Sequence, residues 1–143
     1  RPEGAARFAD RLGRLAAHTN GLREVEAAAG NVFCIERGVV VTPPVASGAL
    51  PGITRSIILG LCARLGISAE VRSLRSEQIH VAEGMFLTLG TRGVVEVSSL
   101  DGRVLASSPI TRRLREAYEE LVARFRRGEA EDWAALAPFP PLA

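Results

Sequence analysis

The six residues from Leu50 to Arg55, Leu-Pro-Gly-Ile-Thr-Arg, restrict the fold of this chain more than any other stretch. Their Pro-Gly pair is typical of a tight turn, and apolar residues recur at helical spacing after it. The pattern predicts a helix over residues 54–65, with Thr54 as its N-cap and Gly66 at its end. Because the first N–H groups of a helix lack partners within the helix, we expect an anion site here. On the residues alone, a connecting turn with an ordinary cap is the simpler alternative.

Helical and strand-like patterns alternate along the rest of the chain, which indicates mixed secondary structure. Apolar residues at helical spacing predict helices over residues 4–17, 54–65, 76–82 (with Ser76 as the cap) and 109–127. β-Branched and apolar runs predict strands over residues 24–28, 31–35, 39–41, 71–74, 85–88, 94–97 and 103–105. The polar residues 18–21 predict a break after the first helix, and Asp101-Gly102 predicts a hairpin turn.

Length and charge exclude several classes of protein. The 143 residues suit a single domain, and a formal net charge of +2 from interleaved acidic and basic residues demands neither a nucleic acid nor a membrane partner. No apolar run approaches the roughly 20 residues that span a bilayer, and no signal-peptide pattern opens the chain, so we expect a cytoplasmic protein. Cys34 and Cys62 fit small core residues of a reducing compartment; a disulfide between them stays open. No metal site is predicted.

Every basic residue is arginine, so the chain contains no lysine. Any mechanism that needs a primary amine on a side chain cannot be completed by these residues alone.

Four motifs occur in a consistent order and spacing. They are Glu26 followed five residues later by Asn31, Thr42-Pro43-Pro44, the Leu50–Arg55 stretch, and Phe86-Leu87-Thr88 running into Arg92-Gly93-Val94. Together they resemble the large C-terminal domain of the class IV (fold type IV) pyridoxal-phosphate enzymes, which include branched-chain and D-amino-acid aminotransferases and aminodeoxychorismate lyase. The resemblance covers residues 22–105. It implies an α/β (α+β) domain, a barrel-like mixed sheet flanked by helices, and a homodimeric enzyme.

The resemblance also implies site residues. Pyridoxal phosphate requires an acid near its pyridine nitrogen and donors around its phosphate group. By motif, Glu26 is the partner of the pyridine nitrogen, although a glutamate that faces solvent from a strand is the alternative. The phosphate ligands implied by the family are Ile53 and Thr54 at the start of the helix, and Gly90 and Thr91 after a later strand.

The later motif distinguishes members of the family. Residues 86–94 look more like aminodeoxychorismate lyase-like members, which eliminate pyruvate to give 4-aminobenzoate, than like branched-chain transaminases. A branched-chain or D-amino-acid aminotransferase, acting on an amino acid, is the alternative. Arg92 is a candidate for binding a substrate carboxylate, with a solvated loop arginine as the alternative. We expect Arg55 to serve packing or a surface ion pair.

The chain departs from the family pattern in several places. The Schiff-base lysine and the small N-terminal domain are absent, so we expect a C-terminal fragment that is inactive alone, divided into residues 1–21 (helix), 22–108 (core sheet and phosphate-binding helix) and 109–143 (helices). Gly84 stands where the family usually has an acid and Glu96 where it usually has proline, which leaves open a non-catalytic homologue. A third possibility is a dimerisation module in which the sheet and the long helix form an interface.

Overall fold

The computed structural model describes residues 17–19, 30–44, 52–89, 93–100 and 102–129. Seven strands lie within these ranges: β1 (Ala17–Thr19), β2 (Gly30–Glu36), β3 (Val39–Thr42), β4 (Ala69–Val71), β5 (Gly84–Leu89), β6 (Gly93–Leu100) and β7 (Arg103–Val104). The helices described there are α2 (Ile53–Leu65), α3 (Ser76–Val81) and α4 (Pro109–Arg126).

The seven strands form one mixed sheet. Its strand order is β1-β6-β5-β2-β3-β4, and β7 pairs with β6. The pairings are antiparallel except for β3 and β4, which are parallel and joined through α2. A parallel pair needs a crossover of this kind, since a tight hairpin reverses the chain direction. The mixed sheet flanked by helices that the resemblance implies is therefore confirmed.

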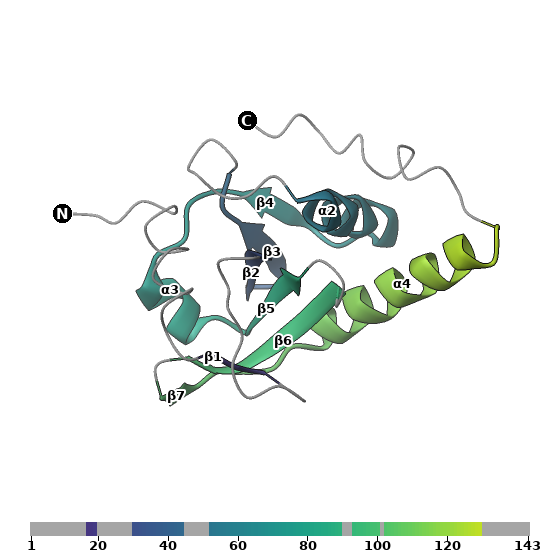
Figure 1. Cartoon of the computed structure of the whole chain (residues 1–143). Helices are drawn as coiled ribbons and strands as arrows, with labels where there is room; N and C mark the ends of the chain where they lie inside the picture. Colours follow the sequence, from purple (N-terminus) through teal and green to yellow (C-terminus); the bar gives the residue numbers. More distant parts are fainter. Residues whose placement is uncertain (1–16, 20–29, 45–51, 90–92, 101, 130–143) are drawn as a thin grey trace.

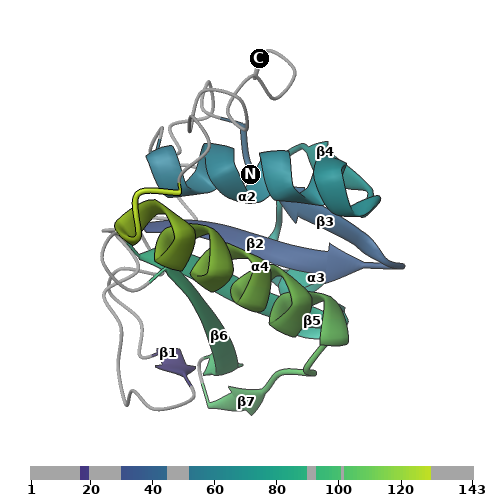
Figure 2. The same cartoon turned by 90° about the vertical axis from the view of Figure 1, so that its right-hand side faces the viewer.

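Helices cover both faces of the sheet, with α2 and α4 on one side and α3 on the other (Figures 1 and 2). Neighbouring residues of β2 point to opposite faces, as the pleat requires. Phe33 and Ile35 pack with α2 and α4, whereas Val32 and Cys34 pack with the residues of α3. Phe33 also stacks on Phe86 of β5, with ring centroids 4.8 Å apart.

The predicted second helix is confirmed, but its cap is not where the sequence suggested. Gly52 is the N-cap of α2, and Thr54 is the second helical residue. At the other end Gly66 adopts the left-handed conformation, with φ of 74°, as predicted. Similarly, Ser76 is the first residue of α3 and Arg75 its N-cap, whose N–H donates to Gln78 Oε1 over 2.7 Å.

The long helix α4 is also confirmed. Ser108 caps it by accepting a hydrogen bond from the Ile110 N–H at 3.1 Å. A β-carbon on Gly84 would lie only 3.0 Å from the Ser108 Cβ and 3.2 Å from its backbone nitrogen. Close packing under this cap is therefore a structural reason for glycine where the family usually has an acid.

One prediction near the N-terminus needs correction, and others there lie outside the described residues. Ala17–Thr19 is a strand paired with β6, although the sequence predicted the end of a helix and a polar break there. The rest of the predicted helix over residues 4–17 and the predicted strand over residues 24–28 lie outside the described residues.

Two later strand predictions have opposite outcomes. The hairpin at residues 101–102 is confirmed, because Leu100 pairs with Arg103. Leu74 was predicted to lie on a strand, but β4 ends at Val71 and Leu74 is a buried residue beyond it.

Candidate functional site

Three strand ends meet at one end of the sheet. Gly30, the first residue of β2, pairs with Leu89, the last residue of β5. Leu89 in turn pairs with Gly93, the first residue of β6. The start of β2 and the connection between β5 and β6 therefore share this end.

The N-terminus of α2 lies against the same end of the sheet. Asn31 Oδ1 is 2.7 Å from the position that a β-carbon on Gly52 would occupy. Asn31 is buried, with 6% of its surface exposed. Nearby, the Thr42 hydroxyl donates to the Val32 carbonyl over 2.7 Å, which fixes the end of β3 against β2. A β-carbon on Gly52 would therefore force the Asn31 side chain to shift.

The first turn of α2 presents backbone donors. The first hydrogen bond of the helix runs from the Ser56 N–H to the Gly52 carbonyl, 3.2 Å. The N–H groups of Ile53, Thr54 and Arg55 precede it, so they have no acceptor within the helix. Gly52 has no side chain to cap them, and the first turn contains no acidic residue. These donors and the helix dipole suit a phosphate group.

Arg55 is buried directly behind this turn. Its side chain is 1% exposed, and Nη2 donates to the Pro43 carbonyl over 2.9 Å. Within the part of the chain that the structure describes, its Nε has no hydrogen-bond partner. Burial lowers the pKa of the Arg55 guanidinium below its ordinary value. The packing role expected for Arg55 is confirmed, whereas the alternative of a surface ion pair is wrong.

The structure describes only part of the predicted site. Ile53 and Thr54 stand at the start of α2, as expected; Ile53 is 77% exposed and Thr54 is partly buried. Glu26 lies outside the described residues, and so do Gly90, Thr91 and Arg92.

Gly93 was not among the predicted site residues, yet it holds the start of β6 in place. Its φ is +72°, and a β-carbon there would lie 2.6 Å from Tyr118 Cε2 of α4. Only glycine satisfies both conditions without strain. In the sequence Gly93 was only part of the family motif over residues 86–94, and its contact with Tyr118 of α4 is a property of the fold.

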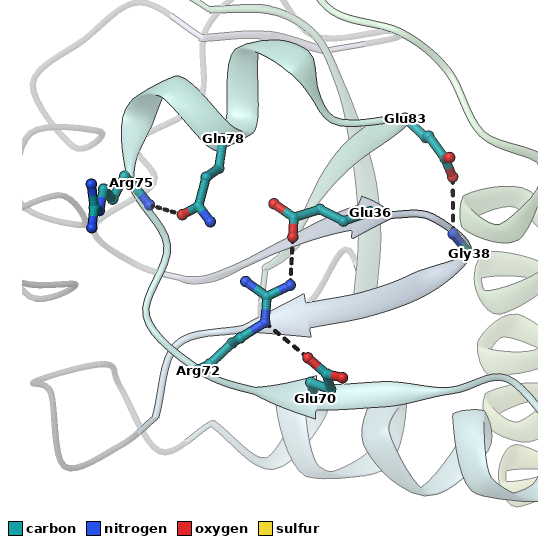
Figure 3. Close-up of polar contacts among 7 residues, drawn as sticks. All are labelled: Glu36, Gly38, Glu70, Arg72, Arg75, Gln78 and Glu83. Carbon is teal, nitrogen blue, oxygen red and sulfur yellow. Dashed lines mark hydrogen bonds and ion pairs between the residues drawn. The ribbon is translucent and has the colours of Figure 1, made fainter.

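A second polar region lies on the face that α3 covers. Arg72 Nη2 contacts Glu36 Oε1 at 2.5 Å, and Arg72 Nε contacts Glu70 Oε1 at 2.8 Å (Figure 3). Glu83 accepts from the Gly38 N–H at 3.1 Å. The hydrogen bonds that Arg72 donates, first to Glu70 and then to Glu36, raise its pKa. These contacts join β2 to the edge strand β4, although exposed ion pairs each contribute only about 0–1 kcal/mol.

The same groups border a cavity of about 550 Å³. It is lined by Glu36, Arg37, Val39, Glu70, Arg72, Gln78, Val81, Ala82 and Glu83. No residue to which the family resemblance assigns a role lines this cavity. Glu36, Glu70 and Arg72 contact one another beside it, so we place the candidate site at the N-terminus of α2 instead.

The cysteines belong to the core. Cys34 and Cys62 are free, fully buried, and members of separate hydrophobic clusters. Burial raises the pKa of each thiol to about 12. The disulfide that the sequence left open is not formed.

Two negative findings apply to the described ranges. No group of three or more histidine, cysteine or acidic side chains is placed there to hold a metal ion. None of the helices within those ranges has both the length and the apolar character to cross a membrane.

Known proteins match most of the described region. The family model for class IV amino-transferases matches residues 15–100. A branched-chain-amino-acid aminotransferase of Salmonella typhimurium is 36% identical over 117 residues, covering 79% of this chain and 37% of that protein. Among solved structures, the Escherichia coli branched-chain amino acid aminotransferase superposes with a TM-score of 0.65 and 35% identity, over 73% of this chain and 35% of that chain.

A Brucella abortus aminotransferase, solved with bound co-factor PLP, superposes with a TM-score of 0.61 and 33% identity, over 65% of this chain and 33% of that one. The chain thus spans little more than a third of the length of the proteins it matches.

Proposed function

The chain belongs to the class IV aminotransferases, a family that depends on pyridoxal phosphate, and we propose that it is the phosphate-binding part of a branched-chain amino acid aminotransferase. One observation carries this proposal: the uncapped N-terminus of α2 lies against the end of the sheet where β2 and β6 begin and β5 ends.

The α2 N-terminus suits the phosphate of this cofactor. Ile53 and Thr54 would donate their backbone N–H groups to the phosphate oxygens, and the helix dipole favours the double negative charge. Gly52 leaves room beside Asn31 that a β-carbon would fill. When bound, pyridoxal phosphate supplies an electron sink for bond breaking at the amino-acid carbon. Gly90 and Thr91 directly follow Leu89, which supports their proposed role as further phosphate ligands.

Glu26 is the proposed partner of the pyridine nitrogen. It precedes Gly30 by four residues, and Gly30 begins β2 at the same end of the sheet as the phosphate donors. A carboxylate there would hold a proton on the ring nitrogen and so stabilise negative charge that develops at the substrate carbon. The amine that binds the cofactor aldehyde in this proposal would have to come from a lysine outside these 143 residues, since they contain none.

The matched proteins favour the alternative reaction over the one that residues 86–94 suggested. The Salmonella typhimurium relative and the Escherichia coli structure are both named branched-chain aminotransferases. None of the proteins described above is named an aminodeoxychorismate lyase. We therefore propose amino-group transfer from a branched-chain amino acid to a 2-oxo acid. Arg92 stays a proposed ligand for the substrate carboxylate, and a homodimer stays the proposed assembly.

The test uses the full-length product of the encoding gene. Purified protein is incubated with pyridoxal phosphate, L-leucine, L-isoleucine or L-valine, and 2-oxoglutarate, and glutamate formation is measured. D-Alanine as donor and release of 4-aminobenzoate from aminodeoxychorismate are run in parallel. Glutamate formed from the L-branched-chain donors supports the proposal. Turnover of either parallel substrate alone would move the assignment to that reaction.

A matched pair of variants tests the role of Glu26. Glu26→Gln should lower turnover by at least about a hundredfold, the usual size of a lost acid–base contribution, and leave the fold intact. Glu24→Gln, two residues away, is the control and should keep parental turnover. Near-normal turnover by the Glu26→Gln variant would show that Glu26 is not part of the site. A parent protein that binds no cofactor and turns over no substrate in any of these assays would support a non-catalytic homologue.

A further inference from the structure

Arg55 occupies a position that is unfavourable for a positive charge. It is the third residue of α2, so it lies in the first turn, where the helix dipole favours acidic side chains. That turn contains no acidic residue, and the N-cap Gly52 supplies no side-chain acceptor. The charge and the uncapped N–H groups both raise the free energy of α2 as long as no anion is bound at its N-terminus.

Burial adds to this cost. Arg55 is the largest fully buried side chain that the structure describes. Its Nη2 donates to the neutral carbonyl of Pro43, and its Nε is without a partner among the described residues. No carboxylate in those ranges forms an ion pair with it. A purely structural role would be met at least as well by an apolar side chain of similar volume.

Local features that oppose folding are concentrated at functional sites, where a ligand compensates them. We propose that Arg55 is a positioning residue that makes the anion site at the N-terminus of α2 selective for a doubly charged phosphate ester. This inference rests on the proposed function and assigns to Arg55 a role in the same site.

Two effects of the guanidinium produce this selectivity. Its hydrogen bond to the Pro43 carbonyl, 2.9 Å, holds the segment that follows β3 against the first turn of α2. Its buried charge adds to the positive potential at the N–H groups of Ile53 and Thr54, because water screens it poorly. A dianion gains more from this potential than a monoanion or a neutral ligand does.

The test compares variants of the full-length gene product. Arg55→Gln retains an amide that can donate to Pro43 but removes the charge, whereas Arg55→Met removes both the charge and the hydrogen bond and keeps an unbranched side chain. Arg64→Gln is the matched control, since Arg64 is an exposed residue in the last turn of the same helix. Equilibrium dialysis measures the affinities for pyridoxal 5'-phosphate, inorganic phosphate and pyridoxal, which lacks the phosphate.

We expect Arg55→Gln to weaken binding of pyridoxal 5'-phosphate and inorganic phosphate by about tenfold or more, and binding of pyridoxal by less than about twofold, as for loss of one charge-assisted interaction. Arg55→Met should weaken binding of both phosphate ligands at least as much, because it also lacks the charge. Arg64→Gln should match the parent. Should Arg55→Gln fail to fold, Arg55→Met decides, and a folded Arg55→Met protein that binds pyridoxal 5'-phosphate and inorganic phosphate within about threefold of the parent would overturn the proposal.

A second readout separates charge from structure. The second pKa of a phosphate monoester is about 6, and a positive potential lowers it. The phosphorus NMR resonance of the bound ester should therefore show protonation at a higher pH in Arg55→Gln than in the parent. Equal losses for pyridoxal and its phosphate, or identical titrations, would overturn this inference alone. A parent protein that binds neither pyridoxal 5'-phosphate nor inorganic phosphate would overturn the proposed function as well.

Discussion

Asn31 Oδ1 lies 2.7 Å from the position that a β-carbon on Gly52 would occupy, so β2 and the N-terminus of α2 are in direct contact. Asn31 is buried, and Gly52 has an ordinary extended conformation with φ of −74°. A β-carbon on Gly52 would force the Asn31 side chain to shift, although the backbone conformation itself suits any residue.

Replacing Gly52 by alanine tests this contact. Because the new β-carbon meets a buried amide, Gly52→Ala should lower the free energy of unfolding by about 1–2 kcal/mol and weaken binding of pyridoxal 5'-phosphate. Urea unfolding and equilibrium dialysis measure the two effects. Combining it with Asn31→Ala removes the colliding oxygen, so the double variant should lose less stability than the sum of the single variants. Strictly additive losses would show that the two residues do not contact each other.

Gly93 and Gly102 provide a matched comparison. Both have a positive φ, of 72° and 76°, but only Gly93 has a neighbour, the ring of Tyr118, within reach of an added β-carbon. The left-handed conformation should cost each alanine variant about 1–2 kcal/mol. Gly93→Ala should lose a further 1–3 kcal/mol, roughly, because of overpacking against Tyr118. Equal destabilisation of the two variants in urea would contradict the described packing of β6 on α4.

The two cysteines should resist chemical modification. Burial raises the pKa of Cys34 and Cys62 to about 12, so both thiols stay protonated at neutral and mildly alkaline pH. The thiolate is the reactive form, and its fraction rises only as the pH approaches 12. Iodoacetamide at pH 8 should therefore leave both peptides unmodified, as measured by mass spectrometry, until denaturant unfolds the protein. Rapid labelling of either cysteine in the native protein would contradict its burial.

Local sequence patterns predicted those ends and turns that are set by a few residues close together in the sequence. Gly66 marked the end of α2, and Asp101-Gly102 marked the hairpin between β6 and β7, because each conformation is set by one or two residues. The two predicted N-caps were wrong. Thr54 and Ser76 have the right chemistry for caps, but the chain enters each helix one or two residues earlier.

Features that depend on distant residues could not be predicted from the sequence. The burial of Arg55 depends on where the segment after β3 places the carbonyl of Pro43. Arg72 and Glu36 are 36 residues apart in the sequence, and only the parallel pairing of β3 and β4 brings them together. The proposed phosphate-binding role of Ile53 and Thr54 rests on the family resemblance, since most Pro-Gly turns before a helix only connect two elements.

Amide hydrogen–deuterium exchange of the full-length gene product shows whether the N–H groups of Ile53 and Thr54 bind the phosphate of the cofactor. Addition of pyridoxal 5'-phosphate should slow exchange in a peptide covering residues 52–58, whereas pyridoxal should slow it much less. If the protein binds pyridoxal 5'-phosphate and exchange in this peptide does not change, the N-terminus of α2 is not the phosphate site.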